Sequence, residues 1–251
     1  MHKGSAGYFC LAHLYKTSES YRQWFLNLRK EQPEAHILLD NGAAEQALVT
    51  QDILLDVVEE LKPTEVIAPD VLNNSSQTIL NLANFQHEMV NRQLIDHTNI
   101  FFCPQGDNMI EWMDTYLFGL EMELVSTIGL SKIALPHCMF GASNDTRIAE
   151  SRSRVIEGLA KLDLLRKPVH LLGAETPFEF NNPAYDHPNV RSTDSCFSVW
   201  AAMNDQDWSI AEPSDLERIP TPHDYFFRDM SETQIKLAKV NIKELNRIIH
   251  D

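Results

Sequence analysis

Carboxylate and amide side chains stand at the ends of several short strand-like runs in this sequence. In chain order, these side chains and the runs that they follow are Asp40 after 37–39, Asp70 after 65–69, Gln105 after 100–103 and Asp194 after 190–193. One carboxylate can attack a carbon and form a covalent intermediate, while a second donates or accepts the proton. Glycosidic bonds are cleaved in this way. If the ends of the runs converge, the sequence predicts a pocket for glycosyl chemistry organised around Asp194.

Glycines at the ends of the same kind of run add backbone donors to this set. Gly106 follows Gln105, and Gly129 follows the run 124–128. A glutamine, an aspartate and backbone N–H groups suit the edge of guanine, which presents N1–H and N2–H donors beside its O6 acceptor. Aspartate and glycine are also common in turns, so turn preference explains each residue taken alone. Their recurrence in successive runs favours a shared site.

Strand-like and helix-like segments alternate along the chain. The predicted strands share a short apolar run without strict alternation and cover 8–14, 36–39, 65–68, 99–103, 124–128, 169–172 and 189–193. The predicted helices share apolar residues at helical spacing and cover 18–29, 44–61, 75–94, 108–120, 146–164, 197–203 and 231–249. Such strands are typical of a parallel sheet that is buried on both faces.

The number of strand–helix units predicts the fold class. Seven or eight units in 251 residues match an α/β fold of the (β/α)8 TIM-like barrel type, without a zinc subdomain. We expect a single domain over residues 1–251 with an irregular last unit, because 205–224 is a polar, proline-punctuated loop that leaves room for a reduced eighth strand. In such a barrel the carboxyl ends of all strands lie on one face, where active sites form. A doubly wound open sheet is the alternative, although no G-x-G-x-x-G follows the first strand.

Charge and composition restrict the class of protein. A formal net charge of −15 argues against a nucleic-acid binder that depends on electrostatics alone, unless basic residues cluster or a partner protein offsets the acidity. Residues 147–167 have a basic bias, which suits a solvated helix face and a phosphate-binding track equally well. There is no run of eighteen apolar residues, and the first residues are too polar for a signal peptide. We therefore expect a cytoplasmic protein without membrane contact.

The pattern of cysteine and histidine predicts no metal site. The cysteines, at 10, 103, 138 and 196, form no C-x-x-C, and no H-x-H follows the first strand. We interpret His137 and Cys138 as packing residues in an irregular stretch that ends at Gly141. We interpret His170 as a core histidine whose hydrogen bonds are satisfied.

In order and spacing, the ends of the runs between residues 36 and 196 resemble motifs of the tRNA-guanine transglycosylases. The matching stretches are Leu39-Asp40-Asn41-Gly42-Ala43 for that family's D-S-G-G-F-Q, Ala68-Pro69-Asp70 for its second base-binding aspartate, Pro104-Gln105-Gly106 for V-Q-G-G, Ile128-Gly129-Leu130-Ser131 for G-G-L, His170-Leu171-Leu172-Gly173 for H-x-x-G, and Ser192-Thr193-Asp194-Ser195 for the stretch with the nucleophile. The ordered set is the specific part of the resemblance, because each motif is short.

The resemblance implies base exchange on a polynucleotide. It assigns Asp194 as the nucleophile at C1′ of a guanosine and Asp40 as the general acid and base. The residues that it assigns to binding of the base are Asp70, Gln105, Gly106, Gly129, Leu130 and Gly173. It implies no cofactor, and a 7-deazaguanine base is the co-substrate.

Departures from the family's pattern bear on the substrate. The C-x-C-x-x-C zinc module of the tRNA enzymes is missing, and the chain is shorter. It is therefore most similar to compact, zinc-less phage relatives that insert 7-deazaguanines into DNA, so we expect DNA, with tRNA as the alternative. Lys132 stands near the position where bacterial relatives have a glutamate, which implies another substituent on the incoming base. A plain N-glycosidase, a non-catalytic binding subunit, a homodimer and a partner protein stay open.

Overall fold

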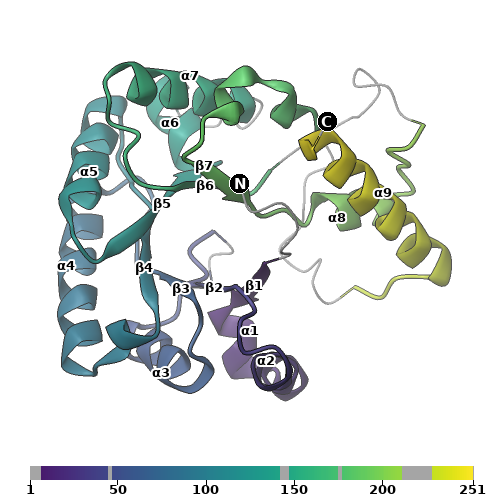
Figure 1. Cartoon of the computed structure of the whole chain (residues 1–251), viewed down its shortest axis with the longest axis horizontal. Helices are drawn as coiled ribbons and strands as arrows, with labels where there is room; N and C mark the ends of the chain where they lie inside the picture. Colours follow the sequence, from purple (N-terminus) through teal and green to yellow (C-terminus); the bar gives the residue numbers. More distant parts are fainter. Residues whose placement is uncertain (1–6, 45–46, 142–146, 175–176, 211–227, 251) are drawn as a thin grey trace.

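The strands form one parallel sheet in which neighbours in space are neighbours in the chain. The computed structural model describes residues 7–44, 47–141, 147–174, 177–210 and 228–250. Within them the sheet has seven strands in the order β1-β2-β3-β4-β5-β6-β7 (Figure 1). The strands are β1 (Tyr8–Leu11), β2 (Ile37–Asp40), β3 (Glu65–Ile67), β4 (Asn99–Phe102), β5 (Val125–Ser131), β6 (Val169–Leu172) and β7 (Val190–Thr193). This order excludes a doubly wound sheet for the described strands, because such a sheet reverses its strand order at a switch point.

Helices surround the outer, convex face of the sheet (Figure 1). The α-helices are α1 (Ala12–Thr17), α2 (Glu19–Glu31), α3 (Gln51–Leu61), α4 (Ser75–Asn91), α5 (Met109–Glu121), α6 (Ala134–Phe140), α7 (Ile148–Lys161), α8 (Phe197–Met203) and α9 (Glu232–His250). Short 3-10 helices are η1 (Leu94–Asp96), η3 (Pro177–Asn181) and η4 (Pro183–Asp186). No helix in the described part of the chain has the length and apolar character needed to cross a bilayer.

An ion pair across the inner, concave face shows how strongly the sheet curls. Glu65 on β3 accepts two hydrogen bonds from Arg191 on β7, at 3.1 and 2.6 Å. The two strands are four positions apart in the sheet, which would separate them by roughly 19 Å if the sheet were flat. Thr127 on β5, between them, is also bonded to both residues. The sheet is therefore a half-barrel, with Glu65 and Arg191 bridging its interior.

Alternate residues of the strands build two apolar layers. One set packs under the helices in the main core and includes Leu39, Val66 and Phe102. The other set lies on the concave face and comprises Leu38, Ile67, Phe101 and Cys103, with Phe9 and Leu172 packed against them. Both faces are buried, which explains why the strands read as apolar runs without alternation.

The prediction of a closed eight-stranded barrel is wrong for the part of the chain that the structure covers. β1 and β7 are the two edges of the sheet, and no described strand joins them. In the segment 205–224, residues 205–210 form no strand, and the remainder lies outside the described residues. The open side of the half-barrel is where α8 and α9 follow β7 (Figure 1). The coarser prediction, a parallel α/β fold related to the TIM barrel, is confirmed.

Several predicted boundaries also differ from the structure. The first strand ends at Leu11 rather than at 14, and α1 begins at once. α3 begins at Gln51 rather than at 44, because the hydroxyl of Thr50 caps it. The stretch 134–140, predicted to be irregular, is α6. Its proline, Pro136, is in the first turn, where a missing N–H breaks no helical hydrogen bond.

α8 and α9 form a small layer of their own beyond β7. Its apolar residues are Phe197, Ala201, Trp208 and Leu245. α9 begins with a capping box, because Ser231 N donates to Gln234 Oε1 and Gln234 N donates to Ser231 Oγ. A buried asparagine on α9, Asn241, accepts from the N–H of Trp208 and donates to two carbonyls, those of Ser198 and Gln206. This side chain holds α9 against the segment that follows the predicted nucleophile.

We expect Asn241→Ala to lower the free energy of unfolding by about 2 kcal/mol, because it leaves three backbone groups, two of them buried, without this partner. Asn246→Ala is the matched control, since it makes the same change on an exposed face of the same helix. Urea denaturation measures both variants. Equal losses for the two would contradict this role of Asn241.

Candidate active site

The predicted site residues lie at the carboxyl end of the sheet. Asp40 is the last residue of β2, and Asp194 follows the last residue of β7. Asp70 and Gln105 lie three residues beyond the ends of β3 and β4. Because parallel strands end at one edge, these loops share the side of the fold on which α/β proteins bind ligands.

Asp70 and Gln105 form one buried group with Asn41, the residue after Asp40, which we call the amide–carboxylate cluster. Asn41 Nδ2 donates to Asp70 Oδ1 at 2.8 Å and to the carbonyl of Ala68 at 3.0 Å. Gln105 Nε2 donates to Asp70 Oδ2 at 2.5 Å. The exposed fractions are 1% for Asn41 and Gln105 and 4% for Asp70. The cluster therefore joins the loops after β2, β3 and β4 into one rigid wall.

Hydrogen-bonding capacity is left over in this cluster. The carboxylate of Asp70 also interacts with its own backbone N–H and with the thiol of Cys103. The Oε1 atom of Gln105 is buried and accepts no hydrogen bond from the described residues. Burial raises the pKa of Asp70, and the bonds from Asn41 and Gln105 offset this only in part. Such a wall can accept hydrogen bonds from a ligand, since unpaired buried acceptors are costly unless something binds them.

Asp40 lies next to this cluster. It is 7% exposed, and its charge acts on the thiol of Cys103. The pKa of that thiol is raised well above its usual value by burial first, then by the charges of Asp70 and Asp40. Both carboxylates are thus close to the same sulfur atom at the end of β4. The structure places Asp40, Asp70 and Gln105 around one part of the concave face.

Asp194 is held by two donors on a single oxygen. His170 Nε2 lies 3.0 Å from Asp194 Oδ1, and the N–H of Gly173 donates to the same atom at 2.9 Å. The described residues give Asp194 Oδ2 no hydrogen bond, and the side chain is 25% exposed. One oxygen is therefore fixed, while the other is available to react.

The surroundings of Asp194 favour the ionised carboxylate. Burial alone would raise its pKa, but the hydrogen bond and charge of His170, the N–H of Gly173 and the charge of Lys132 outweigh burial, and the pKa is lowered. Lys132 lies across Gly173, whose φ of +68° is a conformation that side chains rarely adopt. A Cβ atom at this glycine would be 2.7 Å from Lys132 Cδ. Gly173 thus lets both the lysine and its own N–H come close to the carboxylate.

His170 is a site residue that the sequence interpretation missed. We expected a core histidine, and the side chain is indeed only 5% exposed, but its Nε2 faces Asp194. Since a carboxylate only accepts, Nε2 must be the donor to Asp194, and the other ring nitrogen, Nδ1, forms a hydrogen bond with Ser192 Oγ at 2.8 Å. Arg191 Nε in turn donates to that hydroxyl at 3.3 Å. The H-x-x-G motif was the available signal, because it ends in the glycine that also binds Asp194.

The two groups of residues meet through the concave apolar layer. The ring of Phe101 contacts that of His170 edge to face, with centroids 5.6 Å apart. Phe101 also packs in one apolar cluster with Cys103, the neighbour of the acidic pair. In the described part of the chain, no hydrogen bond links the amide–carboxylate cluster directly to Asp194. The structure thus brings the predicted carboxylates and Gln105 to one end of one face, as two groups that Phe101 connects.

The prediction that the fifth strand ends before Gly129 is wrong, because β5 continues to Ser131. Gly129 pairs with His170 within the sheet, and a Cβ atom there would be 2.6 Å from the ring of Phe101. Leu130 is fully buried in the main core under the helices. Gly106 follows Gln105 in the loop before α5, and its carbonyl accepts from Cys138 Sγ at 3.0 Å. The base-binding roles of these three residues stay predictions.

The other polar groups considered as metal or phosphate ligands make contacts within the protein. Among the residues described, no group of three or more histidine, cysteine, aspartate or glutamate side chains could hold a metal ion. His137 pairs with Asp107, at 3.0 Å.

The basic side chains between 147 and 167 all have intramolecular partners. Arg147 and Arg154 bind Glu150, Arg152 binds Glu179, Lys161 binds Glu157, Arg166 binds Glu121, and Lys167 binds the carbonyls of Gly119 and Met122. These contacts favour a structural role for this stretch over a phosphate-binding track.

Comparisons with known proteins add no assignment. No family model matches the chain, and no curated protein sequence matches it.

Proposed function

We propose that the protein is a base-exchange glycosyltransferase that replaces guanine in DNA with a 7-deazaguanine derivative through a covalent intermediate on Asp194. The observation that carries the proposal is the asymmetric environment of this carboxylate, with Oδ1 held by His170 and Gly173 and Oδ2 without a described partner. A nucleophilic carboxylate needs one oriented oxygen, ionised and open to the substrate. The amide–carboxylate cluster, with its unpaired Gln105 Oε1, supports recognition of a purine nearby.

The proposed reaction has two displacements at C1′. In the first, Asp194 Oδ2 attacks C1′ of a deoxyguanosine, the C1′–N9 bond breaks, and the leaving guanine takes a proton from the carboxyl group of Asp40. In the second, the incoming 7-deazaguanine gives its N9 proton to the carboxylate of Asp40, and N9 attacks C1′. The bond between C1′ and Asp194 then breaks, so both residues return to their starting state. The same carboxyl group acts first as an acid and then as a base, as two-step retaining reactions require.

The residues assigned to the base fit the chemistry of its edge. The donors N1–H and N2–H of guanine would bind acceptors on Asp70 and Gln105, which hold each other in place at 2.5 Å. The raised pKa of Asp70 favours retention of a proton relative to an exposed aspartate, which also suits a hydrogen bond to the O6 acceptor. DNA is proposed over tRNA from the sequence resemblance to zinc-less relatives.

Base exchange is tested by incubating the protein with guanine-containing DNA and a labelled 7-deazaguanine, in parallel with the same reaction on tRNA. Label in DNA supports the proposal, and label in tRNA alone moves the substrate to tRNA. Release of guanine without incorporation would indicate a plain N-glycosidase. No label, no release and no trapped adduct would overturn the enzymatic function.

Recognition of the base is tested separately from chemistry. A ligand that binds only the native state raises the melting temperature, so a 7-deazaguanine should stabilise the protein. We expect Gln105→Met to weaken this binding by about tenfold or more, because the variant loses a hydrogen bond to the base and the one to Asp70. Gln77→Met is the control, because Gln77 is exposed on α4. An unchanged ligand-induced shift in Gln105→Met would contradict the assigned role.

A further inference from the structure

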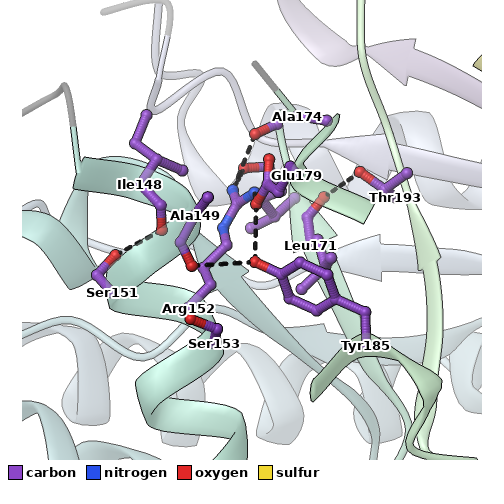
Figure 2. A network of polar contacts seen from close by, with 12 residues as sticks. Ile148, Ala149, Ser151, Arg152, Ser153, Leu171, Ala174, Glu179, Tyr185 and Thr193 are labelled. Carbon is purple, nitrogen blue, oxygen red and sulfur yellow. Dashed lines mark hydrogen bonds and ion pairs between the residues drawn. The ribbon is translucent and has the colours of Figure 1, made fainter. Parts of the chain in front are cut away.

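A buried arginine on α7 contacts the loop that binds Asp194. Arg152 is fully buried, and its Nη1 donates to Glu179 Oε1 at 2.9 Å (Figure 2). Its Nη2 donates to the carbonyls of Leu172 and Gly173, the latter at 2.9 Å. Tyr185 OH donates to Glu179 Oε1 at 3.1 Å, which keeps this carboxylate in place. The guanidinium is thus the centre of a network between α7, η3 and the end of β6.

One of these contacts involves the peptide that donates to Asp194. The carbonyl of Leu172 and the N–H of Gly173 belong to the same peptide unit, so the unit accepts from Arg152 on one side and donates to Asp194 Oδ1 on the other. We propose that Arg152 is a positioning residue for Asp194, which acts by holding and polarising the 172–173 peptide. The proposal rests on the proposed function in one respect only, the role of Asp194 as nucleophile.

Hydrogen-bond cooperativity gives the physical reason. A peptide whose oxygen accepts from a cation becomes a stronger donor through its N–H, and the effect is larger away from water. Arginine stays charged at any working pH, so the polarisation is permanent. The second bond, to the carbonyl of Gly173, fixes the next peptide as well. Orientation matters here because a small misplacement of a reacting group can cost about 100-fold in rate.

Stability alone is a weak explanation for this arrangement. Taking a guanidinium and a carboxylate out of water is costly, and apolar residues of similar volume often serve as well or better. Here both side chains are almost fully buried, with exposed fractions of 0% and 1%. A charged group directed at two carbonyls next to a carboxylate instead suits an electrostatic task.

Variants of the Arg152–Glu179 ion pair test this role, because each is expected to change the pKa of Asp194 in a stated direction. The readout is the pH titration of the Asp194 carboxyl carbon, followed by NMR in the full chain with labelled aspartate. In Arg152→Gln/Glu179→Gln, which removes both charges together, the carboxyl group should titrate at higher pH than in the wild type. Arg152→Lys keeps the charge and should titrate between the two. Glu179→Gln leaves the positive charge of Arg152 without its ion-pair partner, so it should not raise the pH at which Asp194 titrates.

Two further measurements distinguish an effect of Arg152 on Asp194 from a general disturbance of the structure. Formation of the covalent DNA adduct should be about tenfold slower in the double variant at neutral pH, with the acid limb of its pH–rate profile moved to higher pH. Tyr185→Phe is the control, because it disturbs the network through Glu179 and the carbonyl of Ala149 without touching the 172–173 peptide. It should leave the titration of Asp194 unchanged.

Each outcome bears on one proposal. If the double variant does not fold, Arg152→Lys and Glu179→Gln still give the comparison. A titration of Asp194 that is the same in all folded Arg152 variants and in the wild type overturns the positioning role. So does an equal upward shift in Tyr185→Phe. If the wild type forms no adduct but the titrations shift as expected, the transglycosylase proposal fails and the positioning of the carboxylate stands.

Discussion

Asp194→Asn is expected to reduce formation of the covalent DNA adduct by at least about 1,000-fold, because an amide is a poor nucleophile. The asparagine Oδ1 can still accept from His170 Nε2 and from the N–H of Gly173, so the local geometry is kept. The loss is then a loss of chemistry rather than of position. The measurement is the amount of protein–DNA adduct on a denaturing gel after a fixed time.

The control for this variant is Asp186→Asn, which makes the same change at an exposed residue of η4. Its adduct yield should equal that of the wild type. The melting temperature of both variants shows whether they fold. An adduct in Asp194→Asn at the wild-type rate would rule out Asp194 as the nucleophile, and with it the proposed mechanism.

Local sequence signals predicted the parts of the fold that depend on near neighbours. β6 and β7 lie where strand-like runs were predicted, and the residue after β6 is a glycine with positive φ. α5 begins after Asn108, whose side chain accepts from two backbone N–H groups of the first turn. α9 begins at the Ser231–Gln234 capping box. Each signal is a side chain that satisfies the backbone within a few residues.

Errors arose where a residue's role depends on distant contacts. The run 8–14 is apolar except for His13, so periodicity could not reveal that β1 changes into α1 at Ala12. Pro136 suggested an irregular stretch, although a proline in a first turn is tolerated. Curvature is a property of the whole sheet, so the pairing of Glu65 with Arg191, 126 residues later, gave no local signal.

The residues of the candidate site also fall into those that the sequence predicted and those that only the structure reveals. The carboxylates and amide at the ends of strands were predictable, because strand order determines which loops share an edge, and the structure confirms the contact between Asp70 and Gln105. Asn41 was noticed only as part of a motif, yet it binds Asp70 directly. Arg152 counted only toward the basic bias of 147–167, interpreted as a solvated face or a phosphate-binding track, because nothing in the sequence pairs it with Glu179 across 27 residues. Residues that orient a catalytic group thus need the tertiary structure to be recognised.

Arg191→Met is expected to lower the free energy of unfolding by about 3 kcal/mol at pH 7, the largest stability effect that we expect in this protein. Glu65 is 2% exposed, and the variant leaves its carboxylate without its guanidinium partner. Burial alone would raise the pKa of Glu65, but the bonds from His36 and Arg191 and the charge of Arg191 hold it well below its usual range. Urea denaturation at a series of pH values measures the loss.

The pH dependence identifies the cause of that loss. With a depressed folded-state pKa, Glu65 contributes stability above its unfolded pKa of about 4.3, and this is lost as the pH falls through the folded value. In Arg191→Met the bond and charge of the guanidinium no longer oppose burial, so the folded pKa of Glu65 rises and protonation costs less stability than in the wild type. The difference between wild type and variant should therefore shrink towards acid pH. In the double variant Arg191→Met/Glu65→Gln the loss should be smaller than in Arg191→Met at pH 7.

A matched control uses an ion pair of the same type on the surface. Arg166 binds Glu121 with exposed fractions of 50% and 70%, so Arg166→Met should cost less than about 1 kcal/mol. If Arg191→Met lost no more stability than Arg166→Met, the bridge between β3 and β7 would not hold the curl of the sheet. If it loses the larger amount, and recovers stability on protonation, the interior ion pair is what brings β7 back towards β3. Asp194 follows β7 directly, so this curl also determines where its carboxylate stands relative to Asp40 and Asp70.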